Sequence, residues 1–183
     1  MKLDSMQKRV RIRGGASNAK GEVHVPSGFE KDSLLNRKTF MSHEVAHICA
    51  GAKKEFPLNV EIDSIQVQYV EGFSLISVPT DPEDPESTLS LTNLEEGYAT
   101  VAANNLTGGP SKADLPYYKA VSSMFNALLD FADLTIEDVH IYHKNSDIIG
   151  FTAALLGKNP ENVTGEDVLW LLQNSNPAGA LSK

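Results

Sequence analysis

Between residues 33 and 53 the apolar residues recur with the period of an α-helix. Four of them fall at intervals of three, four and seven residues and would form one stripe: Leu34, Met41, Val45 and Ile48. A helix over this range would turn that stripe toward a core and place His43 and His47 on the opposite face. We therefore expect the core contacts of this helix to be made without its two histidines.

Alternating apolar and polar residues follow, a pattern typical of half-buried strands. The alternation runs through residues 60–69 and resumes over residues 73–78, with Glu71 and Gly72 between the two runs. We predict a hairpin with its turn at these two residues, and a second strand that lies at the edge of a sheet. Shorter alternating runs around a glycine-rich turn occupy residues 1–29.

The chain returns to a helical pattern after residue 91. We predict helices over residues 92–106, 114–131 and 148–156, and another that begins after Thr164. The helix at 114–131 has a core face of five apolar residues: Val121, Met124, Phe125, Leu128 and Leu129. These patterns indicate a mostly helical α+β fold.

Composition limits the classes of function. The 183 residues carry a net charge of −8, which argues against a nucleic-acid partner because phosphate contacts need clustered lysines and arginines. Cys49 is the single cysteine, so the chain can form no internal disulfide, and we expect its side chain on the core side of its helix. No apolar run reaches the roughly 20 residues that span a membrane. We predict a cytoplasmic protein without a membrane partner.

Residues 42–47 read SHEVAH, and this stretch is the strongest candidate for chemistry. His43 and His47 are four residues apart, so a helix places both imidazoles on one face, as two ligands of one zinc ion require. Glu44 would lie beside a metal-activated water and accept its proton. A catalytic zinc site needs one more protein ligand and an open position. The alternative interpretation is a helix whose two histidines bind no metal.

The segments around this motif follow one another in a distinctive order. NRKTFMSHEVAHICAGA is followed by a strand pair that ends in LISVP, by the alanine-rich YATVAANNLTGG, and by PSKADLPYYKAV, within residues 36–130. This order resembles the peptidase domain of the FtsH-type ATP-dependent zinc metalloproteases. The resemblance implies a zincin-like zinc helix with a small β-sheet, and Asp114 in SKADL as the third zinc ligand. The chain would add a C-terminal helical bundle.

We expect one metallopeptidase-like domain over residues 1–183. Its parts would be N-terminal strands and a turn at 1–29, a zinc-site core at 30–133 and a helical C-terminal part at 134–183. No ATPase module or membrane segment lies within these residues, so the energy-driven unfolding of the family is not carried over. A separate ATPase partner or a homo-oligomer stays open.

The residues themselves leave the third ligand open. Asp114 is also a favoured N-cap residue for the helix that follows it. Glu96, in LEEGYATVAA, is the rival, because the segment resembles other zincin families in which a glutamate one helix after the zinc helix is a ligand. Those families include peptidases that cleave phage-type repressors. For His140 and His143 we expect structural roles.

The sequence thus predicts a zinc-dependent metallopeptidase that hydrolyses unfolded or extended polypeptides. His43, His47 and Asp114 would hold Zn²⁺, Glu44 would act as general base, and an extended peptide could pair with the strand at 73–78. Three tyrosines are candidate donors to the oxyanion: Tyr98, Tyr117 and Tyr118. Two alternatives are a zinc-containing but catalytically inert binding or scaffold protein, and a repressor-cleaving zincin with Glu96 as third ligand.

Overall fold

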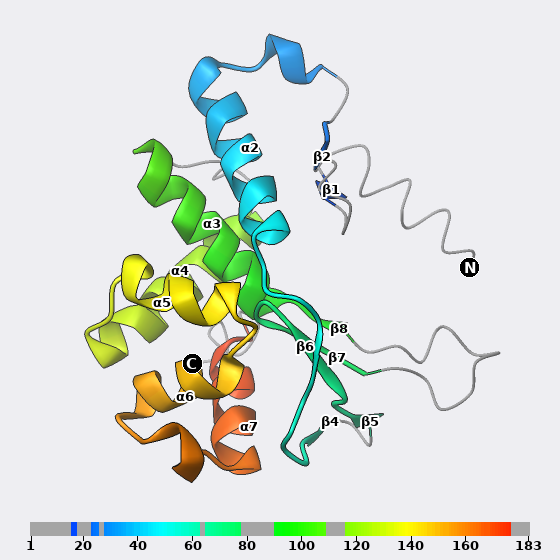
Figure 1. Ribbon diagram of the computed structural model, residues 1–183. Coiled ribbons are helices and arrows are strands. Elements are labelled where there is room, and N and C mark those ends of the chain that lie inside the picture. Colours follow the sequence, from blue (N-terminus) through cyan, green and yellow to red (C-terminus); the bar gives the residue numbers. More distant parts are fainter. Residues whose placement is uncertain are drawn as a thin grey trace, which may run out of the picture.

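The structure is a computed structural model that describes residues 16–17, 23–25, 28–62, 65–77, 90–108 and 116–176. Within these ranges the protein is mostly helical with a small antiparallel sheet, which confirms the α+β class (Figure 1). The helices are η1 (Phe29–Lys31), α2 (Leu34–Ile48), α3 (Asn93–Thr107), α4 (Pro116–Ala132), α5 (Ile136–Lys144), α6 (Ile148–Leu156), η3 (Pro160–Asn162) and α7 (Gly165–Asn174). None of the helices in the described ranges has the length and apolar character needed to cross a bilayer.

The sheet contains four short strands in the order β3-β6-β7-β8, and each neighbouring pair is antiparallel. These strands are β3 (Lys54–Glu55), β6 (Tyr69–Glu71), β7 (Ser74–Ile76) and β8 (Ser90–Leu91). Two strand pairs lie apart from it: β1 (Ala16–Ser17) with β2 (Val23–His24), and β4 (Glu61–Ile62) with β5 (Ile65–Gln66). The single strand predicted over residues 60–69 is therefore wrong, because β4, β5 and β6 divide that run among them.

The hairpin β6–β7 is the part of the sheet that lies nearest to the polar face of α3. Glu71 pairs with Ser74, so the loop consists of Gly72 and Phe73, one residue beyond the predicted turn. Gly72 has a φ of 56°, which glycine adopts without steric cost. β7 lies between β6 and β8, so the prediction of an edge strand at 73–78 is wrong. Alternation cannot reveal a pairing partner as remote as β8.

The helix ends follow signals in the sequence. Thr135 and Thr164 form capping boxes with Asp138 and Asp167, which confirms the predicted start of α7 after Thr164. α3 ends at Gly108, which has a left-handed φ of 67°. The predicted helices at 92–106, 114–131 and 148–156 correspond to α3, α4 and α6 within two residues at each end.

The core is centred on the apolar face of α4. All five residues of the predicted core face are buried, which confirms that prediction. Phe125 packs against Phe73 of the hairpin loop and Phe151 of α6, with ring centroids 6.3 and 6.0 Å apart. Phe73 and Phe151 stack on each other at 4.7 Å. The loop of the hairpin is therefore held against the helical core.

α2 begins where predicted but ends at Ile48, five residues before the predicted end at residue 53, and it buries the other face. The buried residues of α2 are Thr39, Phe40, His43 and Glu44. The predicted core stripe is exposed, with 61% of Leu34 and 46% of Val45 accessible to solvent. Cys49, predicted on the core side, is exposed as well. The expectation that the histidines take no part in packing is thus wrong.

α2 buries its polar face because of the helix that it packs against. Its buried face lies on α3 (Figure 1), and α3 offers polar partners to it. Thr39 Oγ1 lies 3.1 Å from Thr107 Oγ1, and His47 Nδ1 lies 2.9 Å from Glu95 Oε1. Polar groups with such partners can be buried at little cost, so amphipathicity alone does not decide which face is buried.

Candidate metal centre

The α2–α3 interface brings together two of the predicted ligands and the rival third one. Nε2 of His43 lies 3.1 Å from Nε2 of His47. The Glu96 carboxylate lies 3.3 Å from His43 Nε2 through Oε2, and 3.6 Å from His47 Nε2 through Oε1. The three side chains form a cluster of possible ligand atoms that all lie within 4.8 Å of one another.

The spacing of these atoms can be compared with that of a zinc site. In a tetrahedral site with bonds of about 2.0–2.1 Å, neighbouring ligand atoms are roughly 3.3–3.4 Å apart. The two nitrogens are 3.1 Å apart, and each lies near a different oxygen of Glu96, His43 Nε2 at 3.3 Å from Oε2 and His47 Nε2 at 3.6 Å from Oε1. Two imidazoles and one carboxylate are also the donor set of a known class of catalytic zinc sites. The three side chains could therefore hold a metal ion such as zinc.

Glu95 determines which nitrogen of His47 carries the proton. Burial raises the pKa of Glu95, but hydrogen bonds with His143 and His47 outweigh it and lower the pKa from 4.5 to about 2. Glu95 is therefore a carboxylate at neutral pH and can only accept in its 2.9 Å bond with His47 Nδ1. With Nδ1 protonated, the lone pair of neutral His47 is on Nε2, which faces His43 and Glu96.

Thr100 has the matching role for His43. The Thr100 hydroxyl donates to the carbonyl oxygen of Glu96 at 2.7 Å, so its oxygen is available as an acceptor. His43 Nδ1 lies 3.4 Å from that oxygen and is the donor in this longer bond. The lone pair of neutral His43 is then also on Nε2. Two lone pairs 3.1 Å apart repel unless a cation lies between them or one imidazole is protonated.

The charges around His47 favour a cation at this point. Burial lowers the pKa of His47, but the hydrogen bond with Glu95 and the charges of Glu96, Glu95 and Glu44 raise it overall above its ordinary value. The same carboxylates would stabilise a divalent metal ion, which carries more positive charge than an imidazolium. The electrostatics of the cluster thus agree with its spacing.

Glu44 and Tyr118 lie beside the cluster. Glu44 is buried, with 3% of its surface exposed, and its charge raises the pKa of both His47 and Tyr118. Tyr118 on α4 makes an edge contact with the His43 ring, at a centroid distance of 5.4 Å. Burial, followed by the charges of Glu96 and Glu44, raises the Tyr118 pKa well above its ordinary value. Tyr118 therefore stays a protonated phenol that can donate.

The other two tyrosines have different surroundings. The Tyr98 hydroxyl shares a 2.7 Å hydrogen bond with His140 Nδ1, and the Tyr117 hydroxyl donates to Asn93 Oδ1 at 3.1 Å. Burial and the charge of Glu96 raise the Tyr117 pKa to about 12. Among the three, Tyr118 is the tyrosine in ring contact with a candidate ligand.

The three side chains of the cluster differ in exposure. The side chain of His43 is 2% exposed, whereas those of His47 and Glu96 are 17% and 25% exposed. Glu96 Oε2, which lies 3.3 Å from His43 Nε2, is itself buried. A catalytic metal site also needs a position that the protein ligands leave free for substrate.

Some of the predicted residues are in the cluster and one cannot be placed. Asp114, predicted as the third ligand, lies outside the described residues, so that assignment stays a prediction. Among the described residues, it is Glu96 that lies beside the two histidines. Glu95 was missed, although its position next to Glu96 in LEEG was a signal. His143, expected to be structural, bonds to Glu95 at 2.9 Å.

Comparison of the chain with protein-family models, curated proteins and solved structures finds no match. The resemblance to the FtsH-type peptidases therefore stays a prediction.

Proposed function

We propose that this protein is a zinc-dependent metallopeptidase of zincin-like fold that binds its metal through His43, His47 and Glu96. The observation that supports the proposal best is the convergence of two Nε2 atoms, 3.1 Å apart, and the Glu96 carboxylate, whose oxygens lie 3.3 and 3.6 Å from them. Glu96 is proposed as third ligand because of this proximity to both histidines. Assigning Glu96 favours the zincin class in which a glutamate follows on the next helix.

The chemistry divides between the metal and the protein. A bound zinc ion supplies Lewis-acid activation of water and of a peptide carbonyl. Glu44, next to His43 in the sequence and close to His47, accepts a proton from the attacking water and returns it to the leaving amine. Tyr118 is the candidate donor to the oxyanion, because it is a protonated phenol in contact with His43.

An extended polypeptide is the substrate class that the sheet supports. β8 is the outermost described strand on its side of the sheet, and it is followed directly by α3, which carries Glu96. A peptide that pairs with β8 through main-chain hydrogen bonds would be held close to the start of α3, the helix that carries Glu96. The role first assigned to residues 73–78 passes to β8 in this proposal.

The experiment is a joint assay of metal content and peptide cleavage on protein purified without a histidine tag. We expect about one zinc per chain in the wild type and in Glu44→Gln, and strong loss of zinc in Glu96→Gln. Glu44→Gln should lower cleavage of a quenched fluorescent unfolded polypeptide by about 10²–10⁴-fold. Glu166→Gln, at an exposed glutamate of α7, is the matched control and should change neither readout.

The outcomes separate the alternatives. Zinc retained in Glu96→Gln but lost in Asp114→Asn would move the third ligand to Asp114. Zinc without cleavage of any unfolded polypeptide would indicate an inert binding or scaffold protein. Wild-type protein that binds no zinc after incubation and removal of excess metal would reject the proposal.

A further inference from the structure

The Glu95 carboxylate accepts hydrogen bonds from N–H donors of three separate elements. His47 Nδ1 of α2 and His143 Nε2 of α5 each lie 2.9 Å from Oε1. The backbone N–H of Phe73, in the β6–β7 loop, donates to Oε2 at 2.8 Å. A buried carboxylate with three donors has a fixed orientation. Glu95 therefore presents Oε1 to His47 in one direction only.

His143 is aimed at Glu95 alone. Its side chain is fully buried, and its Nε2 contacts both oxygens of Glu95, at 2.9 and 3.1 Å. Its Nδ1 is buried without a hydrogen-bond partner among the described residues. The ring stacks on Tyr98 with centroids 4.0 Å apart. An apolar ring would fill this space without leaving a polar atom unsatisfied, which costs about 1–3 kcal/mol. The imidazole is therefore explained by its bond to Glu95.

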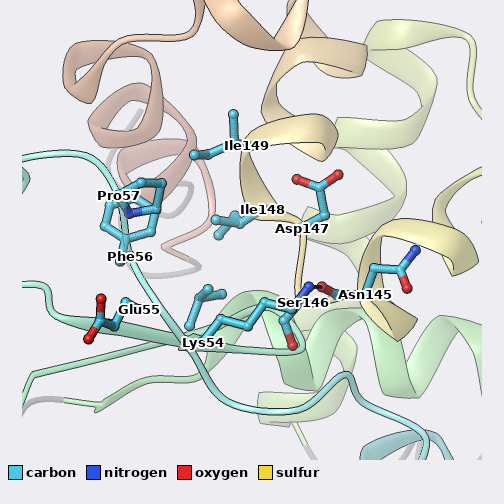
Figure 2. Close-up of a pocket in the computed structure, with 10 residues that line it drawn as sticks. Lys54, Glu55, Phe56, Pro57, Asn145, Ser146, Asp147, Ile148 and Ile149 are labelled. Atoms are coloured by element: carbon cyan, nitrogen blue, oxygen red, sulfur yellow. Dashed lines mark hydrogen bonds between the residues drawn. The ribbon is translucent and has the colours of Figure 1, made fainter.

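The backbone around His143 is tied to the metal-site elements. The His143 carbonyl accepts from Gly51 N–H at 3.1 Å, just beyond the end of α2. A side chain at Gly51 would come within 2.5 Å of the Ser146 nitrogen, so glycine permits this close approach. Lys54 Nζ donates to the Asn145 carbonyl at 2.6 Å. Figure 2 shows the Lys54 side chain reaching toward the turn after α5, across a cavity of about 260 Å³.

The same turn also fixes the hairpin loop. Ser146 Oγ accepts from Gly72 N–H at 2.9 Å. A Cβ at Gly72 would lie 2.6 Å from Glu95 Oε2 and 3.0 Å from His143 Nε2, so the loop rests directly on this pair. α5, the hairpin loop and the segment after α2 thus form one connected support around Glu95.

We propose that His143 is a positioning residue of the metal centre and acts through Glu95. Its Nε2–H holds the Glu95 carboxylate, and Glu95 holds the tautomer and ring orientation of His47. This inference rests on the metal site of the proposed function. Outer partners of metal-ligating histidines change metal affinity or activity by about 10–100-fold when they are removed. His143 lies one contact farther from the metal than such a partner.

The test measures zinc affinity by competition with a chelator in the wild type, His143→Phe and His143→Gln. His143→Phe keeps a buried ring on Tyr98 and removes the donor to Glu95. The matched control is His140→Gln, on the same helix and bonded to Tyr98 but not to Glu95. The visible absorption of the Co²⁺-substituted proteins reports the ligand geometry. Thermal unfolding of the metal-free proteins reports stability.

We expect His143→Phe to weaken zinc binding by about 10-fold or more and to shift the Co²⁺ absorption, with His140→Gln unchanged. His143→Gln, whose amide can donate to Glu95, should recover part of the loss. A folded His143→Phe with wild-type affinity and an unchanged Co²⁺ spectrum would overturn the proposal. If His143→Phe does not fold, the decision passes to His143→Leu, which also removes the donor to Glu95 and for which an unchanged affinity and spectrum would overturn the proposal.

Failure of the peptidase proposal gives a different result. Wild-type protein that binds zinc but cleaves no peptide would reject the hydrolytic function, whereas the affinities and Co²⁺ spectra would still decide the role of His143. Only wild-type protein that binds no zinc would reject both proposals.

Discussion

α2 and α4 have similar lengths, 15 and 17 residues, and both have an apolar stripe with a helical period. α4 buries its stripe, including Val121 and Phe125. α2 exposes its stripe and buries His43 and Glu44 instead. One helix is held in place by apolar packing and the other by polar contacts with α3.

The difference shows what helical periodicity can and cannot decide. Periodicity finds two faces on a helix but does not say which face is buried. The burial of the polar face of α2 depends on partners contributed by α3, 48 residues farther on for the pair of His47 and Glu95. A stripe such as that of α2 remains exposed when the opposite face carries a site.

The largest expected effect is in the helix held by apolar packing. Phe125→Ala should lower the free energy of unfolding by about 3–5 kcal/mol, because it leaves a cavity among buried aromatic rings. Urea unfolding of the metal-free protein measures the change. Phe131→Ala, at an exposed phenylalanine near the end of the same helix, is the control and should change stability far less. If Phe125→Ala lowers the free energy of unfolding by less than about 1 kcal/mol, α4 is not part of the core.

The next largest effect is the stabilisation by zinc, which should depend on the polar face of α2 and not on the apolar packing of α4. Zinc at about 100 times its Kd should raise the free energy of unfolding by about 2.7 kcal/mol, because the ion binds the folded state. The increase should disappear in Glu96→Gln and persist in Phe125→Ala. Urea unfolding with zinc and with a chelator measures both. An increase that survives in Glu96→Gln would show that Glu96 is not a ligand.

A smaller effect is a two-sided pH dependence of the metal-free protein. The pKa of Glu95 falls from 4.5 to about 2 on folding, so its contribution to stability is present above pH 4.5 and is lost as the pH falls toward 2. The pKa of His47 is raised above 6.5, so its contribution is present below pH 6.5 and is lost as the pH rises through the folded-state value. The joint contribution of Glu95 and His47 to the free energy of unfolding should therefore be greatest between pH 4.5 and pH 6.5.

Urea unfolding at about pH 3, 5.5 and 8 in a chelator measures this profile, with an expected amplitude of about 2 kcal/mol on the acid side, between pH 5.5 and 3. Glu95→Gln should flatten its acid side, whereas Glu137→Gln, at an exposed glutamate of α5, should leave it unchanged. If Glu95→Gln loses stability at low pH as steeply as the wild type does, the loss is due to other carboxylates.

The smallest effect is expected on the exposed stripe of α2. Val45→Ser and Leu34→Ser should each change the free energy of unfolding by at most about 0.5 kcal/mol, because both side chains are largely exposed. Urea unfolding measures them beside Val121→Ser, which replaces a fully buried valine of α4. Equal losses at Val45 and Val121 would mean that the stripe is covered, and the contrast between the two helices would fail.

Local signals predicted most of the helices, because each carries its own caps and period. The start of α2 and the buried face of α4 follow from spacing, and the start of α7 follows from Thr164. The strands were predicted less well, since their pairing depends on remote segments such as β8. Short strands of two or three residues also leave little alternation to read.

The residues of the candidate site were likewise predictable only where local spacing determines them. His43, Glu44 and His47 were predictable because one helix carries all three at fixed spacing. The two neighbouring glutamates point about 100° apart on α3, which lets Glu96 face the Nε2 atoms while Glu95 reaches Nδ1 of His47. The bond from Glu95 to His143 joins residues 48 apart in the sequence, so no local pattern could indicate it.

The unequal exposure of the three candidate ligands has a consequence for competition experiments. The His43 side chain is 2% exposed, and those of His47 and Glu96 are 17% and 25% exposed. If this cluster holds an ion, we expect a small chelator to compete with the Glu96 carboxylate more readily than with the buried His43 imidazole.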